Sequence, residues 1–127
     1  MQILIIITCG SSNPARRSSK EEVEFKEFYF GKIDDIINYN NNMSTIGFEY
    51  TENYWLSFYE TTEYLTALTK HKFRYSSGEP PFYLKETDFM KDIKDLKMWY
   101  DNNKCGMTIK VADSIVNANH KKLINCK

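Results

Sequence analysis

The sequence predicts a small single domain, residues 1–127, of the α+β class: a mainly antiparallel sheet with one well-formed amphipathic helix over 88–100 and one or two short helices. Three observations predict this class. Short runs of aromatic and β-branched residues are typical of strands, and clusters of Gly, Asn, Ser and Pro separate these runs. Only one long segment shows clear helical periodicity. At 127 residues, the chain is long enough to bury one hydrophobic core.

The N-terminal third is predicted to contain two strands and a short helix. Residues 3–7 are five consecutive aliphatic residues and indicate a buried strand, and a loop over 10–20 with one Gly, four Ser and one Pro follows it. Residues 23–30 carry apolar side chains for both faces of a second strand, and Gly31 ends it. The isoleucines within 33–37 have helical spacing, and an Asn-rich segment ends that helix.

The middle of the chain is predicted to form a β-hairpin. Its strands are the aromatic runs over 45–50 and 54–59, and residues 51–53 supply the turn. A short helix follows over 61–68, because a threonine pair precedes leucines at helical spacing. Aromatic residues within 73–75 then suggest another strand.

The C-terminal part contains the strongest helix signal. After a loop over 77–81, residues 88–100 place four apolar side chains at spacings of four, three and four: Phe89, Ile93, Leu96 and Tyr100. Alternation over 107–111 predicts a strand, and residues 115–118 begin a final turn or helix.

The three cysteines indicate neither a zinc site nor a disulfide framework. Cys9, Cys105 and Cys126 are widely spaced and form no C-x-x-C pair. We expect three reduced thiols, with a Cys105 to Cys126 bridge as the alternative for an exported chain. No sequence pattern calls for a metal ion or a cofactor, so none is expected.

The N-terminal residues allow two interpretations of the cellular compartment. The aliphatic run over 3–7 ends shortly before Cys9, as at the end of a bacterial lipoprotein leader. However, no Lys or Arg precedes the run, and the run is shorter than a signal-peptide core. We therefore expect a strand in a cytoplasmic protein, with a periplasmic lipoprotein tethered at Cys9 as the alternative.

The only two histidines, His71 and His120, each lie beside lysines. Imidazole titrates near neutral pH, so a histidine with a lysine can support metal-independent nuclease chemistry. Nothing in the sequence shows that the two histidines meet in space. We therefore expect surface histidines and no enzymatic activity, with a small nuclease using His71 or His120 as an alternative.

Charge is segregated along the chain although the net charge is zero. Residues 33–69 contain six acidic residues and no Lys or Arg, whereas residues 70–127 contain twelve basic and seven acidic residues. The acidic stretch is also rich in aromatic residues, and alternation along strands would expose some of them. The predicted partner-binding residues are Asp34, Asp35, Glu49, Tyr50, Glu52, Tyr54, Trp55, Tyr59, Glu60 and Glu63.

Exposed aromatic residues among carboxylates favour a surface that binds a basic protein. The alternative is a hairpin with a buried aromatic face and a solvated acidic edge. In its size, its Asn-, Ile-, Lys- and Tyr-rich composition and its acidic stretch, the chain resembles the immunity proteins of bacterial toxin systems. That resemblance implies an inhibitor that binds a cognate toxin, often a nuclease. A net charge of zero argues against nucleic acid as a partner, and against a membrane unless Cys9 is lipidated.

Overall fold

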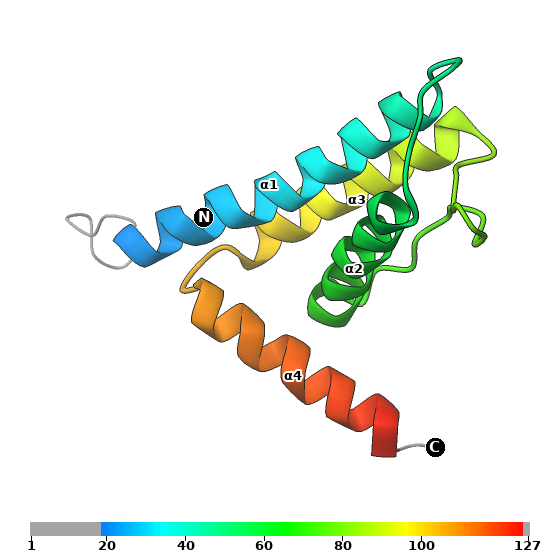
Figure 1. Ribbon diagram of the computed structural model, residues 1–127. Coiled ribbons are helices and arrows are strands. Elements are labelled where there is room, and N and C mark those ends of the chain that lie inside the picture. The colour runs from blue at the N-terminus through cyan, green and yellow to red at the C-terminus, as the bar shows by residue number, and fades with distance from the viewer. Residues whose placement is uncertain (1–18, 126–127) are drawn as a thin grey trace.

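The fold is helical, so the predicted α+β class with a mainly antiparallel sheet is wrong. The computed structural model describes residues 19–125, and their side chains to residue 121. No strand occurs in this described part, where the only β-type pairing is an isolated bridge between Ser76 and Phe82. Four helices make up the fold (Figure 1): α1 (Lys20–Met43), α2 (Glu52–Thr69), α3 (Glu86–Asn103) and α4 (Ile109–Asn125).

Helix α1 replaces the predicted strand over 23–30 and continues through the predicted short helix. Its start is fixed by a capping box, in which the Ser19 hydroxyl accepts from the Glu22 N–H and the Glu22 carboxylate accepts from the Ser19 N–H. Gly31 does not end the helix, because it is exposed and a mid-helix glycine costs only about 1 kcal/mol. Buried side chains recur at helical spacing along α1: Phe25, Tyr29, Ile33 and Ile36.

Helix α2 occupies the region of the predicted hairpin. Its second half is the helix predicted over 61–68, but the helix begins at Glu52, so the strand over 54–59 is wrong. The predicted strand over 45–50 lies partly in the turn after α1 and partly in the loop before α2. Four buried apolar side chains of α2 lie on one helical face, Trp55, Phe58, Leu65 and Leu68, and Ala67 is buried on another side of the helix.

Helix α3 confirms the amphipathic helix predicted over 88–100 and extends it at both ends. The strand predicted over 107–111 is wrong, because α4 begins at Ile109. The turn between α3 and α4 contains Gly106 with a φ of +72°, a conformation that favours glycine. Its N–H donates to the Glu22 carboxylate at 2.7 Å and so ties this turn to the start of α1.

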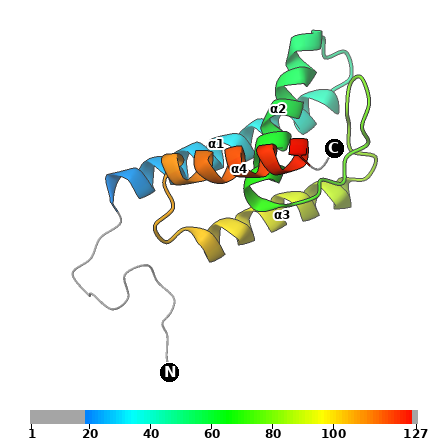
Figure 2. The same cartoon turned by 90° about the horizontal axis from the view of Figure 1, so that it is seen from below.

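Helices α1 and α3 lie side by side and antiparallel, whereas α2 crosses them and contacts both α1 and α4 (Figures 1 and 2). Aromatic rings fill the space between α1 and α3. Tyr29 stacks on Trp99 with ring centroids 5.4 Å apart, and Phe25 stacks on Tyr100 at 6.1 Å. The Tyr29 hydroxyl donates to the Leu96 carbonyl oxygen at 2.7 Å. Large side chains therefore join these two helices.

Truncation of the buried face of α3 should destabilise the fold. Leu96 is fully buried, so Leu96→Ala is expected to lower the free energy of unfolding by about 2 to 5 kcal/mol. Ile93 is only partly buried and should cost less, whereas exposed Lys94→Ala should change stability by about 0.5 kcal/mol or less. Urea denaturation of the three variants measures the order, and equal effects at Leu96 and Lys94 would contradict it.

Candidate functional site

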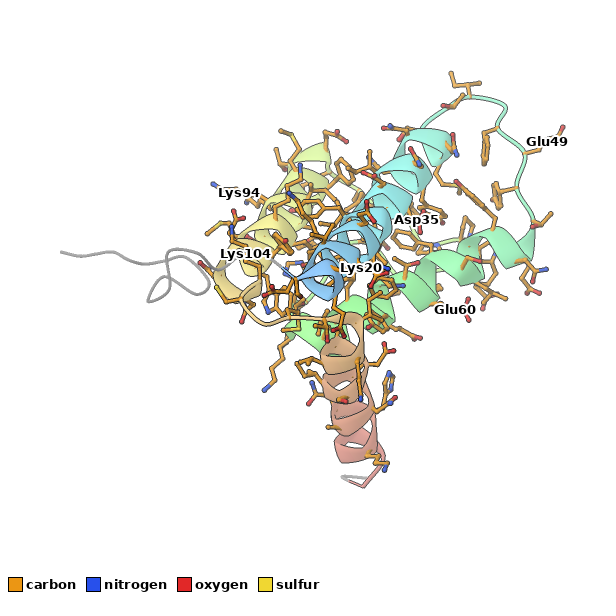
Figure 3. The ribbon with its side chains drawn as sticks, turned by 90° about the vertical axis from the view of Figure 1, so that its left-hand side faces the viewer. Lys20, Asp35, Glu49, Glu60, Lys94 and Lys104 are labelled. Atoms are coloured by element: carbon orange, nitrogen blue, oxygen red, sulfur yellow. The ribbon has the colours of Figure 1, made fainter. Side chains whose placement is uncertain are left out.

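The six carboxylates of residues 33–69 all lie at the protein surface. Asp34 and Asp35 are exposed on α1, and Glu49 is exposed in the loop that joins α1 to α2. The remaining three are exposed on α2: Glu52, Glu60 and Glu63. We call these six residues the acidic surface. Figure 3 shows Asp35, Glu49 and Glu60 on one side of the molecule, and Lys94 on α3 and Lys104 directly after α3 on the other.

No carboxylate of the acidic surface forms an ion pair with another described residue. Every ion pair between described residues involves Asp92 or Asp95, and none involves a carboxylate of the acidic surface. Unpaired charges of one sign project a field that a cation from outside can meet. The six carboxylates of the acidic surface are therefore free to meet a cation from outside the chain.

One cation, Lys32, lies close to the acidic surface without pairing with it. Its ammonium nitrogen is 4.7 Å from the ring centroid of Phe28 and 4.6 Å from that of Tyr64. Burial lowers the pKa of Lys32, and nearby Asp35, Glu60 and Asp113 oppose that change. The ammonium group of Lys32 therefore packs on these two rings. Its positive charge offsets the negative charge of the acidic surface only in part.

The aromatic part of the predicted binding surface is smaller than the sequence indicates. Trp55 is only 9% exposed and belongs to the core. The hydroxyl of Tyr59 donates to the Gly78 carbonyl and accepts from the Gly78 N–H, both at 2.8 Å. Tyr54 is partly buried, whereas Tyr50 is 44% exposed. A partner could therefore reach Tyr50 but not Trp55.

The loop over 44–51 presents apolar groups that the sequence analysis placed in a hairpin. Ile46 at its tip is fully exposed, and Gly47 has a φ of +84°. In Figure 1 this loop projects beyond the ends of the helices it joins. A glycine inside a supposed strand is a turn signal that could have revealed the loop. The exposed Ile46 and Tyr50 beside Glu49 and Glu52 combine apolar area with charge, as protein interfaces do.

A cavity of about 360 Å³ lies between the C-terminal half of α1 and the N-terminal half of α2. The α1 side contributes Asp35 and two asparagines, and the α2 side contributes hydroxyl and aromatic groups. The residues that line it are Asp35, Asn38, Tyr39, Asn42, Tyr54, Ser57, Phe58 and Thr61. Two residues of the predicted site, Asp35 and Tyr54, thus meet in one pocket.

His71 belongs to a structural cluster centred on Asp92, which is fully buried on α3. The Asp92 carboxylate lies 2.9 Å from His71 Nε2 and accepts from the Tyr83 hydroxyl at 2.7 Å. It also accepts from Arg74 through the backbone N–H at 3.0 Å and Nη1 at 2.7 Å. Burial by itself raises the pKa of Asp92, but hydrogen bonds from His71, Arg74 and Tyr83 lower it overall.

The two histidines have different surroundings in the structure. The His71 side chain is only 12% exposed, so the expectation that both histidines lie on the surface is wrong for His71. His120 is exposed on α4, as expected. The contacts of His71 attach the segment between α2 and α3 to α3, and that is a structural role. Sequence reasoning missed Asp92 because its partners are distant in sequence.

Of the three cysteines, only Cys105 lies within the described residues. Cys105 is disulfide-bonded, so the expectation of three reduced thiols is wrong. Cys9, Cys126 and the strand predicted over 3–7 lie outside the described residues.

Among the described helices, none combines the length and hydropathy needed to cross a bilayer, and among the same residues no cluster of metal-binding side chains occurs. No family model, curated protein or solved structure matches this chain.

Proposed function

We propose that the chain is a binding protein whose acidic surface occupies the basic site of a partner protein. The observation that supports this proposal is the set of six exposed carboxylates on α1, α2 and the loop between them, none paired with a described cation. Such a surface repels itself and costs stability in the free protein. A basic partner removes that cost on binding, and its attraction also accelerates association.

The shape of the surface supports a protein partner over a small ligand. The carboxylates extend from Asp35 on α1 through Glu49 in the loop to Glu60 on α2 (Figure 3), so contact with all of them needs an extended partner. The exposed Ile46 and Tyr50 add apolar contact area within the same region. Buried aromatic and aliphatic anchors within a charged rim are how specific interfaces gain affinity.

We further propose the role of an immunity protein that neutralises a cognate bacterial toxin. A nuclease toxin carries a basic substrate-binding site, because it must bind phosphate groups. A surface of unpaired carboxylates is complementary to such a site and can block it directly. The resemblance in size, composition and acidity supports this role, and nothing in it requires the chain itself to be an enzyme.

Reversal of three charges tests the acidic surface. The variant Glu49→Lys, Glu52→Lys, Glu60→Lys is expected to associate with the basic partner about tenfold or more slowly at low salt, because electrostatic steering is lost. Its association should also depend less on salt than that of the wild type. The measurement is association kinetics with the protein encoded by the neighbouring reading frame, with circular dichroism to verify folding.

A matched variant with the same charge change elsewhere separates local from global charge effects. Glu24, Glu27 and Asp101 are exposed and lie outside residues 33–69. Their replacement by lysine should slow association much less than the first variant does. Equal association rates for the wild type and the Glu49, Glu52, Glu60 variant at low salt would reject the acidic surface as the binding site.

A further inference from the structure

The pocket between α1 and α2 is lined by groups that accept hydrogen bonds and by one negative charge. Asp35 is the only carboxylate among the residues that line it, and no Lys or Arg lines it. The Asp35 carboxylate makes no ion pair with any described residue. An anion such as phosphate would find no cation here and would be repelled by Asp35. The charge of the pocket therefore selects a cation.

Helical spacing explains why these side chains converge. Asp35, Asn38 and Asn42 are separated by three and four positions, so they lie along one stripe of α1. Tyr54, Ser57 and Thr61 have the same spacing on α2. The two stripes line opposite sides of one pocket.

One side of the pocket is held rigidly by stacked aromatic rings. The Tyr39 ring lies between Phe58, at a centroid distance of 4.0 Å, and Tyr54, at 5.3 Å. The Tyr39 hydroxyl donates to the Pro81 carbonyl oxygen at 2.7 Å and fixes the ring from the far side. Tyr54 stays partly exposed and offers apolar surface to an entering side chain.

The hydrogen bonds inside the pocket leave acceptors available. Asn42 Nδ2 donates to the Tyr54 hydroxyl at 2.8 Å, so the Asn42 side-chain oxygen has no donor among the described residues. The side chains of Asn38, Ser57 and Thr61 likewise have no hydrogen-bond partner there. These acceptors and the Asp35 carboxylate surround the same space, so a group with several donors can bond to more than one of them.

We infer that this pocket binds the guanidinium group of an arginine side chain of the partner protein. The inference rests on the proposed function and specifies the chemistry of one contact within it. Guanidinium carries five N–H donors in a plane, pairs with carboxylates through two parallel hydrogen bonds, and packs well on aromatic surface. Lysine offers three donors and is more strongly hydrated, so it suits this mixed aromatic and amide lining less well.

The volume of the pocket is large enough to admit one arginine side chain. At about 360 Å³ it lies near the lower end of the roughly 300 to 1,000 Å³ range of small-molecule sites. Arginine is also among the residues that most often dominate binding energy at protein interfaces. An arginine inserted between α1 and α2 would anchor the partner, and the exposed carboxylates around the pocket would steer it.

A titration with small probes tests the pocket without any partner protein. N-acetyl-arginine methylamide is added to the full chain, and backbone amide shifts are followed by NMR. Saturable shifts are expected at the pocket residues of both helices. The neutral isostere N-acetyl-citrulline methylamide should bind about tenfold more weakly, and N-acetyl-lysine methylamide severalfold more weakly. Absence of shifts at the pocket, or equal binding of the arginine and citrulline probes, would overturn the inference.

Two variants on α1 that each remove one negative charge provide a matched pair. Asp35→Asn removes the charge that lines the pocket and is expected to weaken the arginine probe about tenfold. Glu27→Gln removes one negative charge from an exposed position of α1 that lies outside the acidic surface and does not line the pocket, and it should change affinity less than twofold. Equal loss in both variants would show a general electrostatic effect and would reject the pocket.

The probe titration and the charge-reversal assay fail independently. A negative titration rejects the arginine pocket, while the partner assay with lysine at Glu49, Glu52 and Glu60 still decides the acidic surface. Saturable arginine binding that depends on Asp35 supports the pocket even when the tested partner does not bind, and in that case the proposed function fails alone.

Discussion

Replacement of Asp92 by alanine is expected to lower the free energy of unfolding by about 3 to 5 kcal/mol. The Asp92 carboxylate is fully buried, and it lies within hydrogen-bond distance of groups from three other residues: His71, Arg74 and Tyr83. Alanine leaves the Tyr83 hydroxyl and the Arg74 backbone N–H without their acceptor, and each unsatisfied buried group costs free energy. The segment between α2 and α3 should then detach from α3.

Urea denaturation measures this effect, and Asp95 provides the control. Asp95 also pairs with Arg74, at 3.2 Å, but its side chain is 41% exposed. Asp95→Ala should therefore cost about 1 kcal/mol or less, as exposed ion pairs do. A loss at Asp92 no larger than the loss at Asp95 would show that the buried carboxylate does not hold the segment in place.

The pH dependence of stability gives a second measurement on Asp92. Its pKa in the folded protein is lower than the ordinary value of 3.8, because the hydrogen bonds of the carboxylate outweigh the effect of its burial. The carboxylate therefore contributes its full stability above about pH 4, and that contribution is lost as the pH falls through the folded value. The stability difference between the wild type and Asp92→Asn should accordingly be constant near neutral pH and shrink in acid.

The sequence predicts α3 but not α1, because helical spacing and intrinsic residue preference agree in α3 and conflict in α1. In α3, the spacing of Phe89, Leu96 and Tyr100 agrees with a segment otherwise rich in good helix formers. In α1, the spacing of Phe25 and Tyr29 is equally helical, but their aromatic side chains favour strands by intrinsic preference. Packing between α1 and α3 overrides that preference, because it buries these rings completely.

The same conflict explains the false hairpin at α2. Five of the six residues over 54–59 are aromatic or apolar, so the pattern fits a strand and a helix equally well, and composition alone does not distinguish them. The spacing of Trp55, Phe58 and Leu65 marks the buried face of a helix, and it continues into the helix predicted over 61–68. The helix therefore continues through residue 60 without a break.

One part of the candidate site can be predicted from the sequence, and the other part depends on the fold. The absence of Lys and Arg over 33–69 was enough to predict an acidic region, because carboxylates are almost never buried without partners. The burial of Trp55 and the meeting of Asp35 with Tyr54 in one pocket depend on how α1 and α2 pair. Local periodicity indicates which face of a helix is buried, but it does not show which helix packs against that face.

Tyr29 is expected to be the most sensitive aromatic residue of the core, with Tyr29→Ala lowering the free energy of unfolding by about 3 to 5 kcal/mol. Its side chain is 0% exposed and stacks on both Trp99 and Tyr100 of α3. Truncation leaves a cavity between α1 and α3, and the bulky neighbours on both helices limit how far the two can close to fill it.

Tyr29→Phe separates the ring of Tyr29 from its hydroxyl. Phenylalanine keeps the stacking and loses only the hydrogen bond to the Leu96 carbonyl oxygen, so it should cost about 0.5 to 1.5 kcal/mol. Tyr50→Ala serves as the exposed control, because Tyr50 is 44% exposed in the loop, and its effect should be about 0.5 kcal/mol or less. Urea denaturation of the three variants should give the order Tyr29→Ala, Tyr29→Phe, Tyr50→Ala. If phenylalanine destabilised the protein as much as alanine, the hydrogen bond rather than aromatic packing would join α1 to α3.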